Sequence, residues 1–159
     1  MQGVWRALIP LLGLAVIGCE REYGIHRSAT LSTLPDLECI RSVVNETALI
    51  SSVDENHWVS EEQGNDGLRR QSHRYSYQGP DVRGHLGIFV DPGGEIRFVQ
   101  SYIRTDEKPP QTTIDRSLEA MREMARIIEV RCEVEDLVAS IHESCERVEC
   151  RLDRSNGGR

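Results

Sequence analysis

Residues 85–103 read HLGIFVDPGGEIRFVQSYI. Apolar side chains alternate with other residues on both sides of the segment Asp91-Pro92-Gly93-Gly94: Leu86, Ile88 and Val90 before it, and Ile96, Phe98 and Tyr102 after it. Such alternation is typical of strands with one buried face. Asp-Pro-Gly-Gly is typical of a hairpin turn, because proline sets φ and glycine adopts positive φ. The segment therefore predicts two antiparallel strands, over 85–90 and 95–103.

The alternation continues on the N-terminal side of this hairpin. Residues 72–78 place His73, Tyr75 and Tyr77 on one side, and Gly79-Pro80-Asp81 then turns the chain. Three strands therefore form an antiparallel meander with one apolar face, which another layer must cover. We expect the aromatic side chains of this face to pack under that layer rather than line a ligand groove. They are Tyr75, Tyr77, Phe98 and Tyr102.

Two regions of helical periodicity supply the cover. Residues 35–48 carry apolar side chains at helical spacing, with Thr33 as the expected N-cap. After Pro109-Pro110, a second apolar stripe runs from Ile114 to Cys132 and predicts a long helix.

We expect the long helix to open with a capping box of Thr112 and Asp115. A further apolar stripe runs from Val134 to Leu152, out of phase with the first by about half a turn. A bend or break at 132–136 would follow, giving two helices or one kinked helix. The predicted class is α+β, a two-layer α-β-β-β-α arrangement with helices on one face of a small antiparallel meander.

The remaining segments are predicted to connect or to end the domain. Residues 19–33 show no apolar period and predict a flexible tether, and residues 54–71 predict a polar connection. Residues 49–53 are compatible with an extension of the first helix or with an edge strand. We expect one globular domain over 34–152 and a disordered tail over 153–159.

The N-terminal region carries a different kind of pattern. Leu14-Ala15-Val16-Ile17-Gly18-Cys19 closes an apolar run of 12 residues, 7–18, that follows a short positive start. The run suits a signal-peptide core and is shorter than the roughly 20 residues of a bilayer span. The hexapeptide resembles the lipobox of bacterial lipoprotein precursors. The alternatives are an ordinary secretory signal and a buried N-terminal helix with a chance cysteine.

The resemblance implies an address and an anchor. Residues 1–18 would be a removed signal peptide, and Cys19 would bear several acyl chains, which together make a stable membrane anchor. An aspartate after the lipidated cysteine favours the inner membrane in many such proteins. Glu20 occupies that position here. We therefore expect an outer-membrane lipoprotein facing the periplasm, with the inner membrane as the alternative.

With Cys19 assigned to lipid, four cysteines remain: Cys39, Cys132, Cys145 and Cys150. An even number in an exported chain predicts disulfides, here two bonds with three possible pairings. In a continuous helix, Cys132 and Cys145 would lie roughly 20 Å apart, whereas a disulfide needs Cα atoms within about 7 Å. We favour Cys39–Cys132 and Cys145–Cys150, with the helix unwinding at 145–150.

The charge balance excludes some partners. After residues 1–18 the chain carries 18 basic and 26 acidic side chains. This negative balance argues against nucleic acid and against an electrostatic grip on anionic lipid. The expected membrane contact is therefore the lipid on Cys19 alone.

No catalytic or metal-binding pattern stands out. The histidines do not show metal-ligand spacing; they are His26, His57, His73, His85 and His142. His73 and His85 lie on consecutive predicted strands, and we favour ordinary strand histidines over a metal site. No serine has the sequence context of a nucleophile. We expect no catalytic residue, no cofactor and no metal.

These observations favour a non-catalytic lipoprotein that acts as a binding or envelope-assembly module with a protein partner in the envelope. The alternative is a small-ligand-binding or enzyme-inhibitor domain that uses an exposed sheet face. The second face of the sheet discriminates between them, because a flat, charged face would disfavour a pocket. Its expected members are Arg74, Ser76, Phe89, Arg97, Val99 and Ile103.

Overall fold

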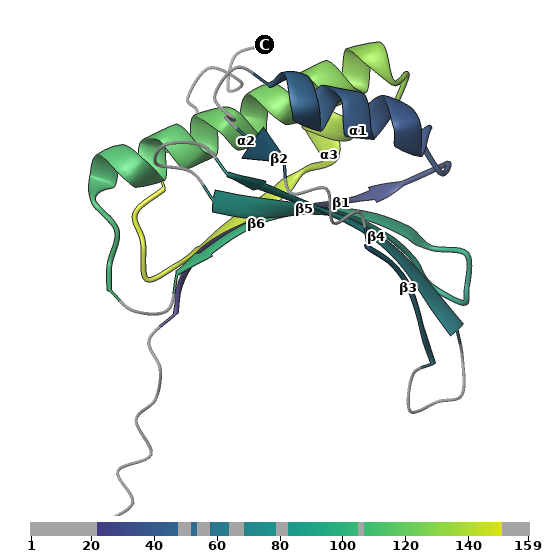
Figure 1. Cartoon of the computed structure of the whole chain (residues 1–159), viewed down its shortest axis with the longest axis horizontal. Coiled ribbons are helices and arrows are strands. Elements are labelled where there is room, and N and C mark those ends of the chain that lie inside the picture. The colour runs from purple at the N-terminus through teal and green to yellow at the C-terminus, as the bar shows by residue number, and fades with distance from the viewer. Residues whose placement is uncertain are drawn as a thin grey trace, which may run out of the picture.

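The computed structural model of the chain describes residues 22–47, 52–53, 58–63, 69–78, 83–104 and 107–150. In chain order the elements are β1 (Tyr23–Leu31), α1 (Leu37–Glu46), β2 (Ser52–Val53), β3 (Trp58–Gln63), β4 (Arg69–Gln78), β5 (Arg83–Val90), β6 (Ile96–Arg104), α2 (Gln111–Arg131), α3 (Leu137–Ser140) and β7 (His142–Glu146). Antiparallel strands and helices form separate layers (Figure 1). The predicted α+β class is confirmed.

The seven strands of the described residues form one sheet, in the order β2-β4-β5-β6-β1-β7, with β3 also pairing with β4. The predicted meander is its middle part, β4-β5-β6. The predicted hairpin turn joins β5 to β6. There the Gly94 N–H donates to the Asp91 carbonyl at 2.9 Å, and Gly94 has a φ of +84°, which glycine adopts without strain.

The sheet is arched, and the helices lie on its convex side (Figure 1). Its aromatic side chains pack beneath them, as predicted: Tyr75, Tyr77, Phe98 and Tyr102 are all buried. The Tyr75 hydroxyl also donates to the Leu37 carbonyl of α1 at 3.1 Å. The concave side faces away from the helices.

The four cysteines are paired as predicted. Cys39 in α1 bonds to Cys132, the C-cap of α2, with their Cα atoms 5.7 Å apart. Cys145 in β7 bonds to Cys150, with their Cα atoms 6.2 Å apart. Both separations fall in the ordinary disulfide range. The first bond ties the two main helices together, and the second fixes the chain after β7.

The predicted tether over 19–33 is wrong for residues 23–31, which form β1 inside the sheet between β6 and β7. Ile25, Ala29 and Leu31 are buried at alternate positions, but the fourth member of the row is Arg27. A charged residue interrupts the apolar period, and the Glu143 that pairs with it lies far along the chain. The first element of the described residues is therefore a strand rather than a helix.

The helix predicted from the stripe Val134 to Leu152 is also wrong. The break at 132–136 is confirmed, because Glu133 and Asp136 both have a φ of 53°. After it the chain forms only the four-residue α3 and then β7. The predicted unwinding of that helix at 145–150 is therefore wrong as well, because the chain is already extended in β7 at Cys145. The left-handed backbone at Glu133 and Asp136 ends the long helix. The chain that follows pairs instead with the free edge of β1 and forms β7.

Both predicted helix starts differ in detail. Asp36 caps α1 in place of Thr33, and its carboxylate accepts from the Glu38 N–H at 2.9 Å. Pro35 explains the shift, since the residue before a proline is disfavoured in a helix. Pro110 is the N-cap of α2 without a side-chain cap, so the predicted capping box of Thr112 and Asp115 does not form.

The predicted connection over 54–71 contains β3, which pairs with β4 along its length. Of the two alternatives for 49–53, the edge strand is confirmed for Ser52–Val53. The predicted signal peptide 1–18, the lipid site Cys19 and the tail 153–159 lie outside the described residues.

Candidate functional site

The candidate site is the concave face of the sheet, which the helices leave uncovered (Figure 1). Because side chains alternate along a strand, every second residue of β1, β4, β5, β6 and β7 faces this side. The strand registers align one row across five strands: Ser76, His85, Ser101, His26 and Ser144. The next row is Arg74, Gly87, Val99, Ser28 and His142. The face is thus rich in serine, histidine and arginine.

The concave face contains a hollow of about 230 Å³ over β4, β5 and β6. Its lining includes Arg74, Ser76, His85, Gly87, Phe89 and Val99. Apolar side chains and a glycine backbone therefore lie next to polar groups from neighbouring strands. Four of the six residues expected on this face, Arg74, Ser76, Phe89 and Val99, line the hollow, and the curvature distinguishes the face from a flat, charged surface.

Phe89 organises one side of the hollow. Its ring lies over Gly87, where an added Cβ would come within 2.5 Å of the ring, so only glycine leaves room for it. Arg74 lies over the ring at 5.4 Å from its centroid, and Arg97 lies at 5.7 Å. These cation–π contacts hold both guanidinium groups in place.

The two arginines differ in their charge partners. Arg97 donates to the Asp91 carboxylate from Nε at 2.9 Å and from a terminal nitrogen at 3.3 Å. Among the described residues, no carboxylate forms an ion pair with Arg74. Within the part of the chain that the structure describes, Arg74 therefore presents a positive charge at the hollow that no carboxylate pairs with.

His85 forms the polar side of the hollow with Ser76. The Ser76 hydroxyl oxygen and His85 Nδ1 are 2.9 Å apart. Burial lowers the pKa of His85, and the charges of Arg74 and Arg83 lower it further. The imidazole is therefore held in its neutral form, where it can both donate and accept.

A serine next to a histidine is also the start of a nucleophile–base arrangement. Within the described part of the chain, the charged groups that act on His85 are both arginines, and no carboxylate orients its ring. The backbone of β5 pairs with strands on both sides, so its N–H groups are used by the sheet. We interpret the pair as a binding contact. That the protein has no catalytic site stays a prediction.

The other side of the sheet holds a buried polar cluster between β1, β7 and α2. Arg27, which is 4% exposed, lies with Nε 3.1 Å from a Glu143 oxygen and donates to the Gln100 side chain at 2.8 Å. Arg122 of α2 donates to the other Glu143 oxygen at 2.9 Å. Gln100 donates in turn to the Met121 carbonyl at 3.0 Å. Both Glu143 oxygens therefore face arginines.

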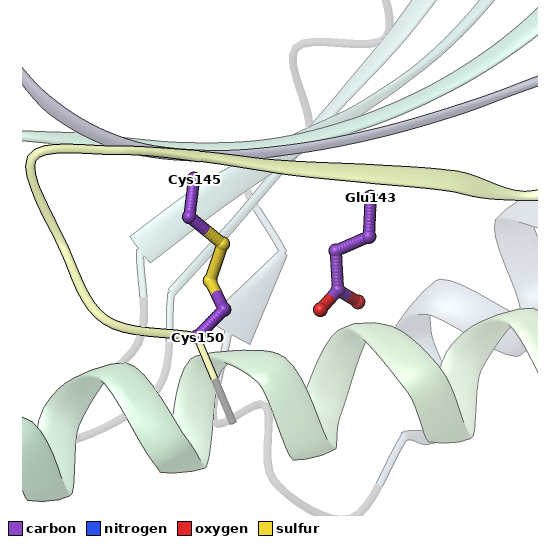
Figure 2. Close-up of side chains that lie close together, drawn as sticks. All are labelled: Glu143, Cys145 and Cys150. Atoms are coloured by element: carbon purple, nitrogen blue, oxygen red, sulfur yellow. A yellow bond between two sulfur atoms is a disulfide. The ribbon is translucent and has the colours of Figure 1, made fainter. Parts of the chain in front are cut away.

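Figure 2 shows Glu143 beside the Cys145–Cys150 disulfide, with both directed from β7 toward α2. A carboxylate oxygen of Glu143 and the two sulfur atoms lie within 4.8 Å of one another. Among the described residues, these three side chains are the one cluster with the composition of a metal site. The sulfurs are bonded to each other, and the carboxylate is occupied by Arg27 and Arg122. The group lacks the thiolate that a metal would need.

No protein-family model, curated protein or solved structure matches the chain. Within the described residues, no helix has the length and apolar character required to cross a membrane.

Sequence reasoning found the β4–β6 part of the site and missed the rest. His26 and Ser28 lie in the segment predicted as a tether, and His142 and Ser144 lie in the segment predicted as a helix, but both segments form strands of the sheet. His73 and His85 lie on opposite faces, since His73 is buried under the helices and His85 lines the hollow. A signal for β1 existed in the alternation of Ile25, Ala29 and Leu31.

Proposed function

We propose that the protein is a non-catalytic, lipid-anchored binding module of the cell envelope, and that its concave sheet face holds a protein partner. One observation carries the proposal: the helices cover one side of the sheet and leave the curved side, with its hollow, uncovered (Figure 1). A sheet face with a half-buried aromatic ring and an arginine that no described carboxylate pairs with is a surface suited to recognition.

The dimensions favour a protein partner over a small ligand. Small-molecule sites usually enclose about 300–1,000 Å³, and this hollow holds about 230 Å³ within a longer curved face. It has room for a side chain of a partner whose remaining surface contacts the rest of the arch. The alternative, a small-ligand-binding domain, draws its support from the same hollow.

The start of β1 sets the distance to the membrane. The lipobox resemblance of residues 14–19 supports lipid on Cys19, and Glu20 supports the outer membrane as destination. Only three residues lie between Cys19 and Tyr23, the first residue of β1, so the chain advances by four residue steps. At about 3.5 Å per residue, they reach at most about 14 Å. The domain would therefore act close to the bilayer, and its partner would be a membrane-associated envelope protein.

Photocrosslinking in cells tests the proposal. A photoreactive residue is placed at Ile103, which is 43% exposed on the concave face, or at Val130, which is 80% exposed on α2. We expect one discrete envelope partner from position 103 and none from the matched control at 130. Crosslinks from 130 alone, or no crosslink from 103, would contradict the proposal. A small-ligand module would give no protein crosslink from 103 while the purified protein retained a bound molecule.

A further inference from the structure

We propose that the hollow receives a carboxylate side chain from the protein partner, bound between Arg74 and the Ser76–His85 pair. This proposal rests on the function proposed above and deepens it by naming the chemistry of the partner: a segment in which an acidic residue is flanked by apolar ones.

The first support is the charge at the hollow. The whole chain has a formal net charge of −7, yet the charged groups acting at the hollow are arginines. Arg74 lines it, and Arg74 and Arg83 both act on His85 from the same face. Asp91, an acidic residue in the adjoining turn, is already paired with Arg97. The hollow is therefore a positive site on an acidic protein.

The second support is the state of Arg74. Its guanidinium lies over the Phe89 ring, so less side-chain freedom remains to be lost when a ligand binds. A guanidinium presents a planar fork of donors that matches the two oxygens of a carboxylate. Arg97 on the same face already binds a carboxylate in this way, because two of its nitrogens donate to the two carboxylate oxygens of Asp91.

The third support is the Ser76–His85 contact. When the Ser76 hydroxyl donates to Nδ1 across the 2.9 Å contact, the neutral ring keeps its hydrogen on Nε2. That N–H remains a donor for an incoming oxygen. Val99 and Gly87 supply an apolar surface for the methylene groups of a glutamate.

The acidity of the chain as a whole limits the kind of partner. A polyacidic tail would be repelled by the surrounding surface, whereas one carboxylate among apolar residues meets only the hollow. Phosphate groups of lipids share the chemistry of an oxyanion, but a lipid surface would bring the rest of the acidic domain against anionic headgroups. We therefore assign the site to an acidic protein segment.

The test uses the full-length, lipidated, oxidised protein in detergent and two peptides, N-acetyl-Leu-Glu-Leu-amide and N-acetyl-Leu-Gln-Leu-amide. Binding is followed by amide chemical shifts in the NMR spectrum. We expect saturable shifts in β4, β5 and β6 with the glutamate peptide. The glutamine peptide should bind at least about tenfold more weakly, because a hydrogen bond to a charged group contributes more binding free energy than a hydrogen bond between neutral groups.

Two matched variants locate the effect. Arg74→Gln should remove the preference for glutamate, and Arg97→Gln, which deletes the same charge from the same face, should keep it. Unchanged spectra elsewhere in each variant show that the fold is intact. Equal binding of the two peptides, equal loss in both variants, or no saturable shift at about 10 mM peptide would overturn the proposal.

A parallel experiment with lipid vesicles tests whether lipid phosphate groups, rather than a protein carboxylate, bind in the hollow. Vesicles of phosphatidylglycerol and phosphatidylethanolamine should not shift the hollow residues in an Arg74-dependent way, and such shifts without glutamate binding would overturn the assignment to protein. The two proposals also fail separately. A partner crosslinked from Ile103 together with equal binding of both peptides sinks the carboxylate assignment alone, whereas absence of any crosslink from Ile103 sinks the proposed function.

Discussion

At the scale of single residues, the buried ion-pair cluster is the feature with the largest expected energetic effect. Arg27 is enclosed between the sheet and α2, and Glu143 faces both Arg27 and Arg122. Burial lowers the pKa of Arg27, and the nearby Glu143 opposes that shift. Removing one partner of a buried pair leaves a charge without compensation, which is costly in a low-dielectric site.

We predict that Glu143→Ala lowers the free energy of unfolding by about 3 kcal/mol or more. The matched control is Glu46→Ala, which removes the exposed ion pair between Glu46 and Arg131. Its effect should be much smaller, because exposed pairs contribute little. Urea unfolding of the two variants measures both values. Equal losses would show that Arg27 is not stabilised by Glu143.

His85 gives a second prediction at this scale, on the pH dependence of stability. Its pKa in the folded protein lies below the ordinary 6.5, first because of burial and then because of Arg74 and Arg83. The unfolded chain therefore binds a proton more readily than the folded one. The stability that follows is fully present above pH 6.5 and is lost as the pH falls through the lowered pKa of the folded state.

The difference in unfolding free energy between the wild type and His85→Gln should therefore shrink from about pH 7 to about pH 5. Denaturant titrations at several pH values measure it. A difference that is constant across this range, or one that grows in acid, would contradict the lowered pKa.

At the scale of elements, the disulfides fix different parts of the fold. The Cys39–Cys132 bond spans a sequence separation of 93 and links α1 to the end of α2, whereas Cys145–Cys150 spans only 5. In loop-entropy models the long loop contributes about 5 kcal/mol and the short one about 2 kcal/mol.

We expect the Cys39→Ala/Cys132→Ala double variant to lose more than twice as much stability as Cys145→Ala/Cys150→Ala. Melting temperatures under non-reducing conditions test this order. The wild type should likewise melt far above its reduced form. A larger loss from the short-loop variant would mean that packing of the segment after β7, rather than loop entropy, dominates.

The same elements show what the sequence could predict. β4, β5 and β6 were predictable because most inward positions of each strand are apolar or aromatic, with the uncharged Gln100 as the interruption in β6, and because the turn between β5 and β6 contains proline and glycine at the positions that require them. Covalent geometry argued against one of the three disulfide pairings, on the assumption of a continuous helix that the structure does not contain, and the pairing favoured among the other two is the one observed. The concave face was predictable only where these strands form it.

β1 and β7 were not predictable by the same reasoning. Arg27 breaks the apolar row of β1, and its burial is compensated by Glu143 from the other end of the domain. Val134, Val138 and Ile141 fit a helical period, but the left-handed residues Glu133 and Asp136 divide the chain there. Each strand depends on the other through pairing and the ion pair, so the deciding interaction is long-range.

At the scale of the whole molecule, the proposed lipid on Cys19 would hold the proposed binding face close to the membrane. If lipid on Cys19 holds the domain, Cys19→Ser should release the protein from membranes into the soluble envelope fraction, with the fold and both disulfides unchanged. Membrane flotation of the wild type and the variant measures this outcome. A Cys19→Ser protein that still floats with membranes would contradict the anchor.

The most direct test of the binding face uses one substitution at two positions. Val99→Glu places a carboxylate in the hollow, and Val130→Glu places one on the exposed side of α2, where Val130 is 80% exposed. Recovery of the envelope partner with lipidated protein is then measured after both variants are shown to melt like the wild type. We predict that Val99→Glu loses the partner and Val130→Glu retains it. Undiminished recovery with Val99→Glu would contradict the claim that the concave face is the binding surface.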